Sequence, residues 1–192
     1  LVAGQEHFVV MNNLFGTRVL VGLGLVVLVI LGSCGVSVYR TRQLHDDAVL
    51  VAHTHEVIAA VSDVMSLMKD AETGQRGYLI TSRDSYLEPY LSAKASVHKQ
   101  VELLRELTID NESQRQNVAR LLELVDARLL ILDENLAVHD RQGFEAAQLR
   151  IAEGRGKAAM DAVRAHVATM INEERALMDE RSGQFARQFR TA

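Results

Sequence analysis

An apolar run that carries no charged side chain constrains the fold of this chain more than any other feature. The run extends from Val19 to Tyr39 and is bounded by Arg18 and Arg40. A helix of this length spans about 31 Å at 1.5 Å per residue, close to the thickness of the hydrocarbon core of a bilayer. Tyr39 also lies where an interfacial aromatic residue is expected. The sequence therefore predicts a transmembrane helix over residues 19–39.

Two other interpretations of this run remain open. One is a buried core helix of a soluble protein, although a fully apolar run of this length is rare in soluble domains. The other is a cleaved signal, because Leu31-Gly32-Ser33-Cys34 resembles a bacterial lipobox. Cleavage before Cys34, followed by lipidation, would leave a lipid-anchored protein. The run continues past Cys34 through Val36 and Val38, which favours a membrane span over a signal.

The sequence after residue 40 favours long helices. It is rich in Ala, Leu, Glu, Arg and Gln, and the whole chain has a single Pro and no Trp. Apolar residues recur at steps of three and four positions, as in a heptad seam. The pattern predicts helices over residues 40–81, 84–108, 112–140 and 143–192. The residues expected to face inward are Val57, Val61, Val64, Met68, Ala71, Tyr90, Val97, Val101, Leu104, Val118, Leu122, Val125, Leu129, Leu132, Leu136, Met160, Val163, Val167, Met170 and Leu177.

Short turns separate the predicted helices. Capping groups occur at Ser82–Ser85 and Asp110–Ser113, and Gly143 follows the third helix. Connections this short force antiparallel neighbours, so the expected fold class is all-α, with an N-terminal transmembrane helix followed by an up-down-up-down four-helix bundle. The two outer helices are longer than the middle two and are expected to continue as a two-helix stalk. Such a stalk buries its seam better against a second copy, so we expect a homodimer.

Several functions have no support in the sequence. The net charge of -4 gives no basic surface for nucleic acid. The single cysteine, Cys34, excludes an internal disulfide. His53 and His55 lie two positions apart and point to different helix faces, and no second His completes a zinc-protease motif. We therefore expect a non-catalytic chain without a cofactor or metal site.

An unusual motif lies in the first predicted bundle helix. Residues 70–80 read Asp-Ala-Glu-Thr-Gly-Gln-Arg-Gly-Tyr-Leu-Ile, and residues 86–90 read Tyr-Leu-Glu-Pro-Tyr. Gly74 and Gly77 lie one turn apart, and each costs about 1 kcal/mol of helix propensity relative to Ala. The close approach of another helix, or a deliberate weak point, would compensate for this cost. Glu72 and Arg76, spaced i,i+4, have the order that favours an ion pair.

This motif resembles the CHASE domain of type three, a sensory module of bacterial signalling receptors. The residues that match the core pattern of the family are Asp70, Glu72, Thr73, Gly74, Gln75, Arg76, Gly77, Tyr78 and Leu79, extended by Tyr86 and Tyr90. A looser match follows at Gly156, Met160, Asp161, Met170, Glu173 and Glu174. The resemblance covers roughly residues 40–180. It departs from the family pattern at the turn Thr81-Ser82-Arg83, which lacks the Gly that we expect there.

The resemblance implies how the protein is organised around a bacterial inner membrane. Residues 40–192 are expected in the periplasm or extracellular space and residues 1–18 in the cytoplasm, with Met11 as a candidate start. Arg18 precedes the span and two Arg residues follow it, which weakly opposes this orientation. Long domains translocate regardless of such counts, so the resemblance decides the orientation. A second span and an output domain are expected downstream in the same chain.

The function that the resemblance implies is sensory input. An extracytoplasmic stimulus would be relayed by helix movement, most often to a histidine kinase and sometimes to a diguanylate cyclase. The alternatives are the ligand-binding region of a methyl-accepting chemotaxis receptor and a lipid-anchored structural or adaptor bundle. The predicted inner stripes are nearly all aliphatic, so the sequence does not identify the ligand.

Two roles are open for Arg76. In the first, Arg76 forms a solvated surface pair with Glu72, and Tyr78 is an ordinary core residue. In the second, Arg76 points into the bundle and pairs with Glu173 or Glu174 on the last helix. A buried pair of this kind would fix the register of the two helices.

The apolar run predicts an uncleaved integral membrane protein. After expression, the protein should be recovered in the membrane fraction, with an intact mass that includes the residues before Cys34. Cell fractionation and mass spectrometry measure both quantities. Recovery in the soluble fraction, or a mass that begins at a lipidated Cys34, would contradict the prediction.

Overall fold

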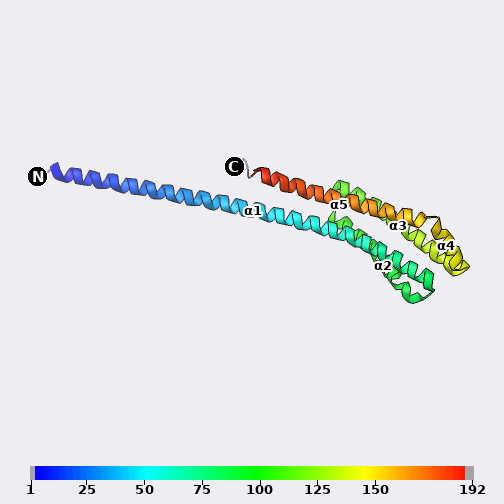
Figure 1. Cartoon of the computed structure of the whole chain (residues 1–192). Helices are drawn as coiled ribbons and strands as arrows, with labels where there is room; N and C mark the ends of the chain where they lie inside the picture. The colour runs from blue at the N-terminus through cyan, green and yellow to red at the C-terminus, as the bar shows by residue number, and fades with distance from the viewer. Residues whose placement is uncertain (1–2, 189–192) are drawn as a thin grey trace. The chain divides into compact units, whose positions relative to one another are not determined.

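Helices and the turns between them make up the described part of the chain. The computed structural model describes the backbone of residues 3–188 and the side chains of residues 22–39, 41–42 and 49–180. No strand occurs among residues 3–188, which confirms the predicted all-α fold class. The elements are α1 (Ala3–Thr81), the short 3-10 helix η1 (Asp84–Tyr86), α2 (Glu88–Leu107), α3 (Glu112–Gln142), α4 (Phe144–Ala152) and α5 (Arg155–Gln188) (Figure 1).

The chain divides into two compact units, Leu1–Leu50 and Val51–Ala192. In the first unit, Gly22–Tyr39 is long and apolar enough to cross a membrane, with a mean hydropathy of 2.2. None of this window is buried against other parts of the chain, and Leu28 for example is 68% exposed. An exposed apolar surface of this kind suits contact with lipid. The helix continues without a break through Cys34.

The second unit has one hydrophobic core to which four long helices contribute. Every residue of the predicted inner stripes is buried except Leu122 and Leu177, which are partly buried. On α3 the fully buried neighbour of Leu122 is Leu121. Burying side chains of this size stabilises the fold by about 1.5–3 kcal/mol each. The core residues are Val57, Ala60, Val61, Val64, Met65, Met68, Ala71, Leu79, Tyr90, Ala93, Val97, Val101, Leu104, Val118, Leu121, Val125, Leu129, Leu132, Leu136, Ala147, Met160, Val163, Val167 and Met170.

Polar contacts between neighbouring helices show that successive long helices run in opposite directions. On α2 and α3, Lys94 contacts Asp133 at 2.6 Å, whereas His98, one turn later on α2, contacts Asp126 at 2.8 Å. The same inversion relates α3 to α5, where Gln114 donates to the Met170 carbonyl oxygen and the Asn117 carbonyl oxygen accepts from His166. The antiparallel order of neighbours expected from the short turns is therefore present in residues 51–180.

The predicted fourth helix is two helices. Gly154 adopts φ of +79°, and its backbone closes the end of α4 before α5 begins at Arg155. Gly reaches this left-handed conformation without the strain that a Cβ would cause. It therefore ends α4 within a segment that the spacing of apolar residues predicted as one helix. Gly143, predicted to separate the third and fourth segments, does so with φ of +85°.

The turn between α1 and α2 differs from the prediction. Side chains of Ser82–Ser85 do not cap α2; instead η1 intervenes, and α2 begins at Glu88 with Pro89 in its first turn. Ser82 adopts φ of +50°, a left-handed conformation that explains why Gly is expected there. At α3 the predicted cap is correct, because the Asn111 side chain accepts a hydrogen bond of 3.2 Å from the Gln114 backbone N–H.

Gly74 and Gly77 allow the start of α2 to pack directly on α1. A Cβ on Gly74 would lie 2.6 Å from the backbone nitrogen of Tyr90 and 3.2 Å from the carbonyl oxygen of Tyr86. A Cβ on Gly77 would lie 2.8 Å from the Cδ1 atom of the Tyr86 ring. The close approach expected from the two glycines is therefore present, and it explains why the glycines and the two tyrosines belong to one motif.

This packing predicts that Gly74→Ala destabilises the bundle more than Gly77→Ala. At Gly74 the obstacle is backbone, so overpacking costs about 1–3 kcal/mol and outweighs the gain of about 1 kcal/mol in helix propensity. At Gly77 the obstacle is the Tyr86 side chain, which is 47% exposed and has room to rotate. Thermal unfolding of the detergent-solubilised chain measures the difference, with exposed Thr73→Ala as a control on α1. Equal effects of the two glycine substitutions would show that the backbone contact is not limiting.

Candidate functional site

The motif tyrosines connect α1 and α2 to α3. The Tyr78 hydroxyl donates to Asp140 Oδ1 at 2.9 Å, and its ring meets the His139 ring edge to face at a centroid distance of 5.2 Å. The Tyr90 hydroxyl donates to Asp133, which also holds Lys94 at 2.6 and 2.7 Å. The hydrogen bond to Asp140 raises the pKa of Tyr78, and burial followed by the bond to Asp133 raises the pKa of Tyr90. Both hydroxyls therefore remain neutral donors at physiological pH.

Gln75 is the motif residue that lies deepest between helices. Its side chain is 2% exposed, and its Nε2 atom donates to the backbone carbonyl oxygen of Leu132 at 2.6 Å. A buried amide without a partner is costly, so this bond fixes α1 at one register along α3. Asp70 and Thr73, by contrast, are exposed on the outer face of α1.

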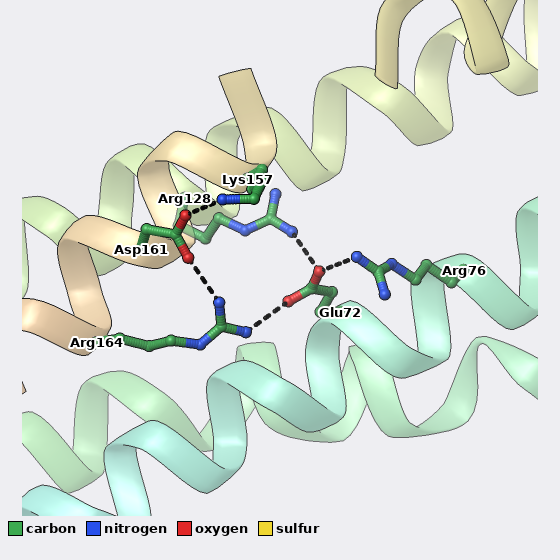
Figure 2. A network of polar contacts seen from close by, with 6 residues as sticks. All are labelled: Glu72, Arg76, Arg128, Lys157, Asp161 and Arg164. Atoms are coloured by element: carbon green, nitrogen blue, oxygen red, sulfur yellow. Dashed lines mark hydrogen bonds and ion pairs between the residues drawn. The ribbon is translucent and has the colours of Figure 1, made fainter. Parts of the chain in front are cut away.

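Glu72 is the centre of a charged network that joins three helices. Its side chain is only 12% exposed and faces three arginines (Figure 2). Arg76 on α1 lies 2.5 Å from Glu72 Oε1, Arg128 on α3 lies 3.7 Å from the same oxygen, and Arg164 on α5 lies 4.0 Å from Oε2. We call these four residues, together with Lys157 and Asp161, the Glu72 network. One carboxylate thus connects α1, α3 and α5.

Asp161 extends the network along α5. It accepts hydrogen bonds from Lys157 at 2.5 Å and from Arg164 at 2.8 Å (Figure 2). The bond from Lys157, followed by that from Arg164, lowers the pKa of the Asp161 carboxyl. Arg164 therefore bridges two carboxylates, Asp161 on its own helix and Glu72 on α1.

Arg128 is the buried member of the Glu72 network. Its side chain is 4% exposed, and its Nε and Nη1 atoms have no hydrogen-bond partner in the described part of the chain. Burial lowers the pKa of Arg128, the Glu72 carboxylate opposes that effect, and Arg76 and Arg164 lower the pKa further. An arginine keeps its charge in proteins even so, which means that a cation lies inside the bundle with one carboxylate at 3.7 Å.

A cavity of about 90 Å³ opens beside Arg128. Its walls come from α1, α3, α4 and α5, and they include Glu72, Gln75, Arg128, Arg150 and Gly156. A Cβ on Gly156 would lie 3.0 Å from Arg128 Nη1, so Gly at this position leaves room for the guanidinium group. Among the described residues, no group of three His, Cys, Asp or Glu side chains is placed to hold a metal ion.

The second role considered for Arg76 is wrong. The Arg76 side chain is 69% exposed and pairs with Glu72 one turn earlier on the same helix. Glu173 instead accepts a hydrogen bond of 2.7 Å from Asn117 near the start of α3. Glu174 is buried and lines a small cavity with Val57, which lies about five turns before Arg76 on α1. Glu173 and Glu174 therefore lie too far along the bundle to meet Arg76.

The first role, a surface pair with Glu72, is the one that Arg76 has, and the buried arginine of the bundle is Arg128. A signal for it exists in the sequence, because alternating steps of three and four from Val118 lead through Leu121 and Val125 to Arg128. The same steps continue through Leu132 and Asn135 to His139, and all of these residues are buried. The predicted stripe followed apolar residues only, so it passed from Val125 to Leu129 and left Arg128 out.

The described part of the chain thus combines a helical bundle that contains a charged network with a candidate membrane span in the preceding unit. The fold is similar to that of the sensor domain of the Rhodopseudomonas palustris histidine kinase HK9, with a TM-score of 0.61 and 21% sequence identity. The similarity covers 66% of this chain and 98% of that sensor domain. A search of the curated proteins found no match.

The family of the chain follows from its sequence. Residues 47–184 match the CHASE3 domain, so the chain belongs to the CHASE3 family. The resemblance carried by the motif at residues 70–80 is thereby confirmed. CHASE3 domains are extracellular sensory parts of membrane receptors, and this region is accordingly a sensory domain rather than a catalytic one.

The Glu72 network predicts a large difference between two substitutions of its members. Glu72→Gln leaves the buried Arg128 without its carboxylate and should lower the free energy of unfolding by about 3–5 kcal/mol. Arg76→Ala removes an exposed partner and should cost less than about 1 kcal/mol. Thermal or denaturant unfolding of the detergent-solubilised chain measures both. A Glu72→Gln protein as stable as the Arg76→Ala protein would show that Arg128 does not depend on this carboxylate.

Proposed function

We propose that this chain is the sensory input region of a bacterial transmembrane receptor that passes an extracytoplasmic signal to an output domain in the same protein. The observation that carries the proposal is the CHASE3 match over residues 47–184, together with a candidate span at Gly22–Tyr39 in the same continuous helix. A domain that shares a helix with a membrane span has a direct mechanical path to the membrane.

The proposed mechanism is a movement of α1 and α5 relative to each other. Both helices contribute to the core of the bundle, and Glu72 and Arg164 connect them at 4.0 Å. Packed helices favour discrete arrangements over continuous bending. A stimulus that changes the contacts of the Glu72 network would therefore shift the helix pair from one packing arrangement to another.

A histidine kinase is the proposed output. The similar fold of the HK9 sensor domain, which belongs to a histidine kinase, agrees with this proposal. We further propose that the bundle lies in the periplasm, that the span crosses the inner membrane and that the receptor is a homodimer. In a dimer, the exposed apolar side chains of α1 before residue 52, such as Val49 and Leu50, gain a partner surface.

The proposal predicts that signalling depends on helix phase. Two residues inserted after Phe185 in α5 should abolish or invert the response of the full-length receptor, because 100° per residue turns the following helix by about 200°. Seven inserted residues return the phase to within about 20° and should keep most of the response. The measurement is autophosphorylation with and without stimulus in membranes that contain each variant.

The seven-residue insertion is the matched control, because it lengthens the helix more while preserving its phase. Equal responses of both variants would contradict transmission through helix phase. If the receptor synthesises a cyclic dinucleotide instead of phosphorylating itself, the output domain is a cyclase. If the receptor is methylated instead, it is a chemotaxis receptor. Either result would reject the kinase output and leave the proposed sensory role in place.

A further inference from the structure

The cavity beside Arg128 has the composition of an anion-binding site. Arg76, Arg128, Arg150, Arg155 and Lys157 line it, whereas Glu72 is the carboxylate in its wall. These cations come from α1, α3, α4 and α5, so the tertiary fold rather than one helix surface brings them together.

Neighbouring carboxylates only partly neutralise these cations. Glu134 pairs with Arg150 and lies 3.9 Å from Arg155, and Asp161 pairs with Lys157 and Arg164. Six cationic side chains, with Arg164 included, therefore share the three carboxylates Glu72, Glu134 and Asp161. The excess positive charge favours an additional negative group in the cavity, and a low local dielectric strengthens that preference.

Arg128 supplies the donor inside the cavity. Its Nη2 atom faces Glu72 at 3.7 Å, while its buried Nη1 atom, near Gly156 in the cavity wall, has no hydrogen-bond partner among the described residues. Arginine donates in a fixed planar geometry that suits carboxylate and phosphate oxygens. Arg155 and Lys157, whose side chains are 56% and 80% exposed, lie where an anion could enter from solvent.

The size of the cavity limits the ligand. A volume of about 90 Å³ exceeds the roughly 10–15 Å³ that one water requires by this measure. It is far below the roughly 300–1,000 Å³ of pockets that hold drug-sized molecules. A small oxyanion fits this range, and a large organic ligand does not.

We propose that the cavity binds a small oxyanion of the carboxylate or phosphate type through Arg128. Resting on the proposed sensory function, we also propose that this anion is a stimulus of the receptor. The bound anion connects α3 to α4 and α5. It lies next to Glu72, whose carboxylate connects α1 to α3 and α5. Binding therefore changes the balance of charge around Glu72 and the relative preference for alternative helix packings.

The test is binding of sodium acetate and of sodium phosphate to the detergent-solubilised chain, measured by calorimetry and by thermal unfolding in a sulfonate buffer. One of the two anions should bind saturably and raise the unfolding temperature, because a ligand of the folded state stabilises it. Acetate binding would identify a carboxylate ligand and phosphate binding an inorganic one. Sodium chloride at equal ionic strength controls for charge screening.

Two variants locate the site. Arg128→Gln should abolish the saturable effect, and Gly156→Ala, which keeps every charge and folds around one extra methyl group, should weaken binding about tenfold or more. The control Arg105→Gln removes an exposed arginine paired with Glu102 on α2 and should bind like the parent. Absence of saturable binding by both anions, an equal effect of chloride, or unchanged binding by Gly156→Ala would overturn the proposed site.

Receptor output is a separate readout. If the anion binds in the parent and fails to bind in Gly156→Ala, autophosphorylation of the full-length receptor should respond to it in the parent alone. Binding without any change in output would leave the anion site in place and reject the anion as stimulus. A receptor that responds to another stimulus, with no anion binding, would leave the sensory function in place and reject the site.

Discussion

The structure of the bundle depends on how it accommodates a buried arginine. Transfer of an unpaired charge into a protein interior costs several kcal/mol or more, so Arg128 requires the Glu72 carboxylate that reaches it from α1. That carboxylate also faces Arg76 and Arg164, and neither is as buried as Arg128. The position of α1 along α3 and α5 is consequently set by charge as well as by apolar packing. An aliphatic seam tolerates sliding by a heptad, whereas one carboxylate among three arginines does not.

The close contact between α1 and α2 acts together with this network. Gly74 lies between Glu72 and Arg76 on α1, and its bare face receives the backbone of Tyr90. Tyr90 in turn donates to Asp133 on α3, and Gln75 donates to the carbonyl of Leu132 one residue earlier. Three residues within four consecutive positions of α1, Glu72, Gly74 and Gln75, therefore contact α2, α3 and α5. This concentration explains why the most distinctive stretch of the sequence is short while the rest of each helix follows an ordinary heptad pattern.

The helical architecture could be predicted from the sequence, but the buried charge could not. Apolar stepping located the four long helices and nearly all core positions, because burial of aliphatic side chains repeats with the helical period. It did not find the break at Gly154, since one Gly is tolerated inside a helix and only the left-handed φ of +79° ends it. It also left open whether Arg76 is buried and did not identify Arg128 as the buried cation. Which arginine turns inward depends on contacts between helices far apart in the chain, whereas local spacing reveals only the pair of Arg76 with Glu72 on the same helix.

Polar residues in the seam of α3 give the bundle a property that an aliphatic core lacks. Gln114, Arg128, Asn135 and His139 occupy seam positions, and each is buried. A core of aliphatic side chains stabilises one packing strongly and responds little to charge. A buried cation that is only partly neutralised makes the free energy of packing depend on nearby anions. A sensory domain needs at least two packings that differ by only a few kcal/mol. The unsatisfied donors of Arg128 lie where α1 and α5 meet across one carboxylate, so the part of the core whose packing depends most on charge is also a part that joins the two helices.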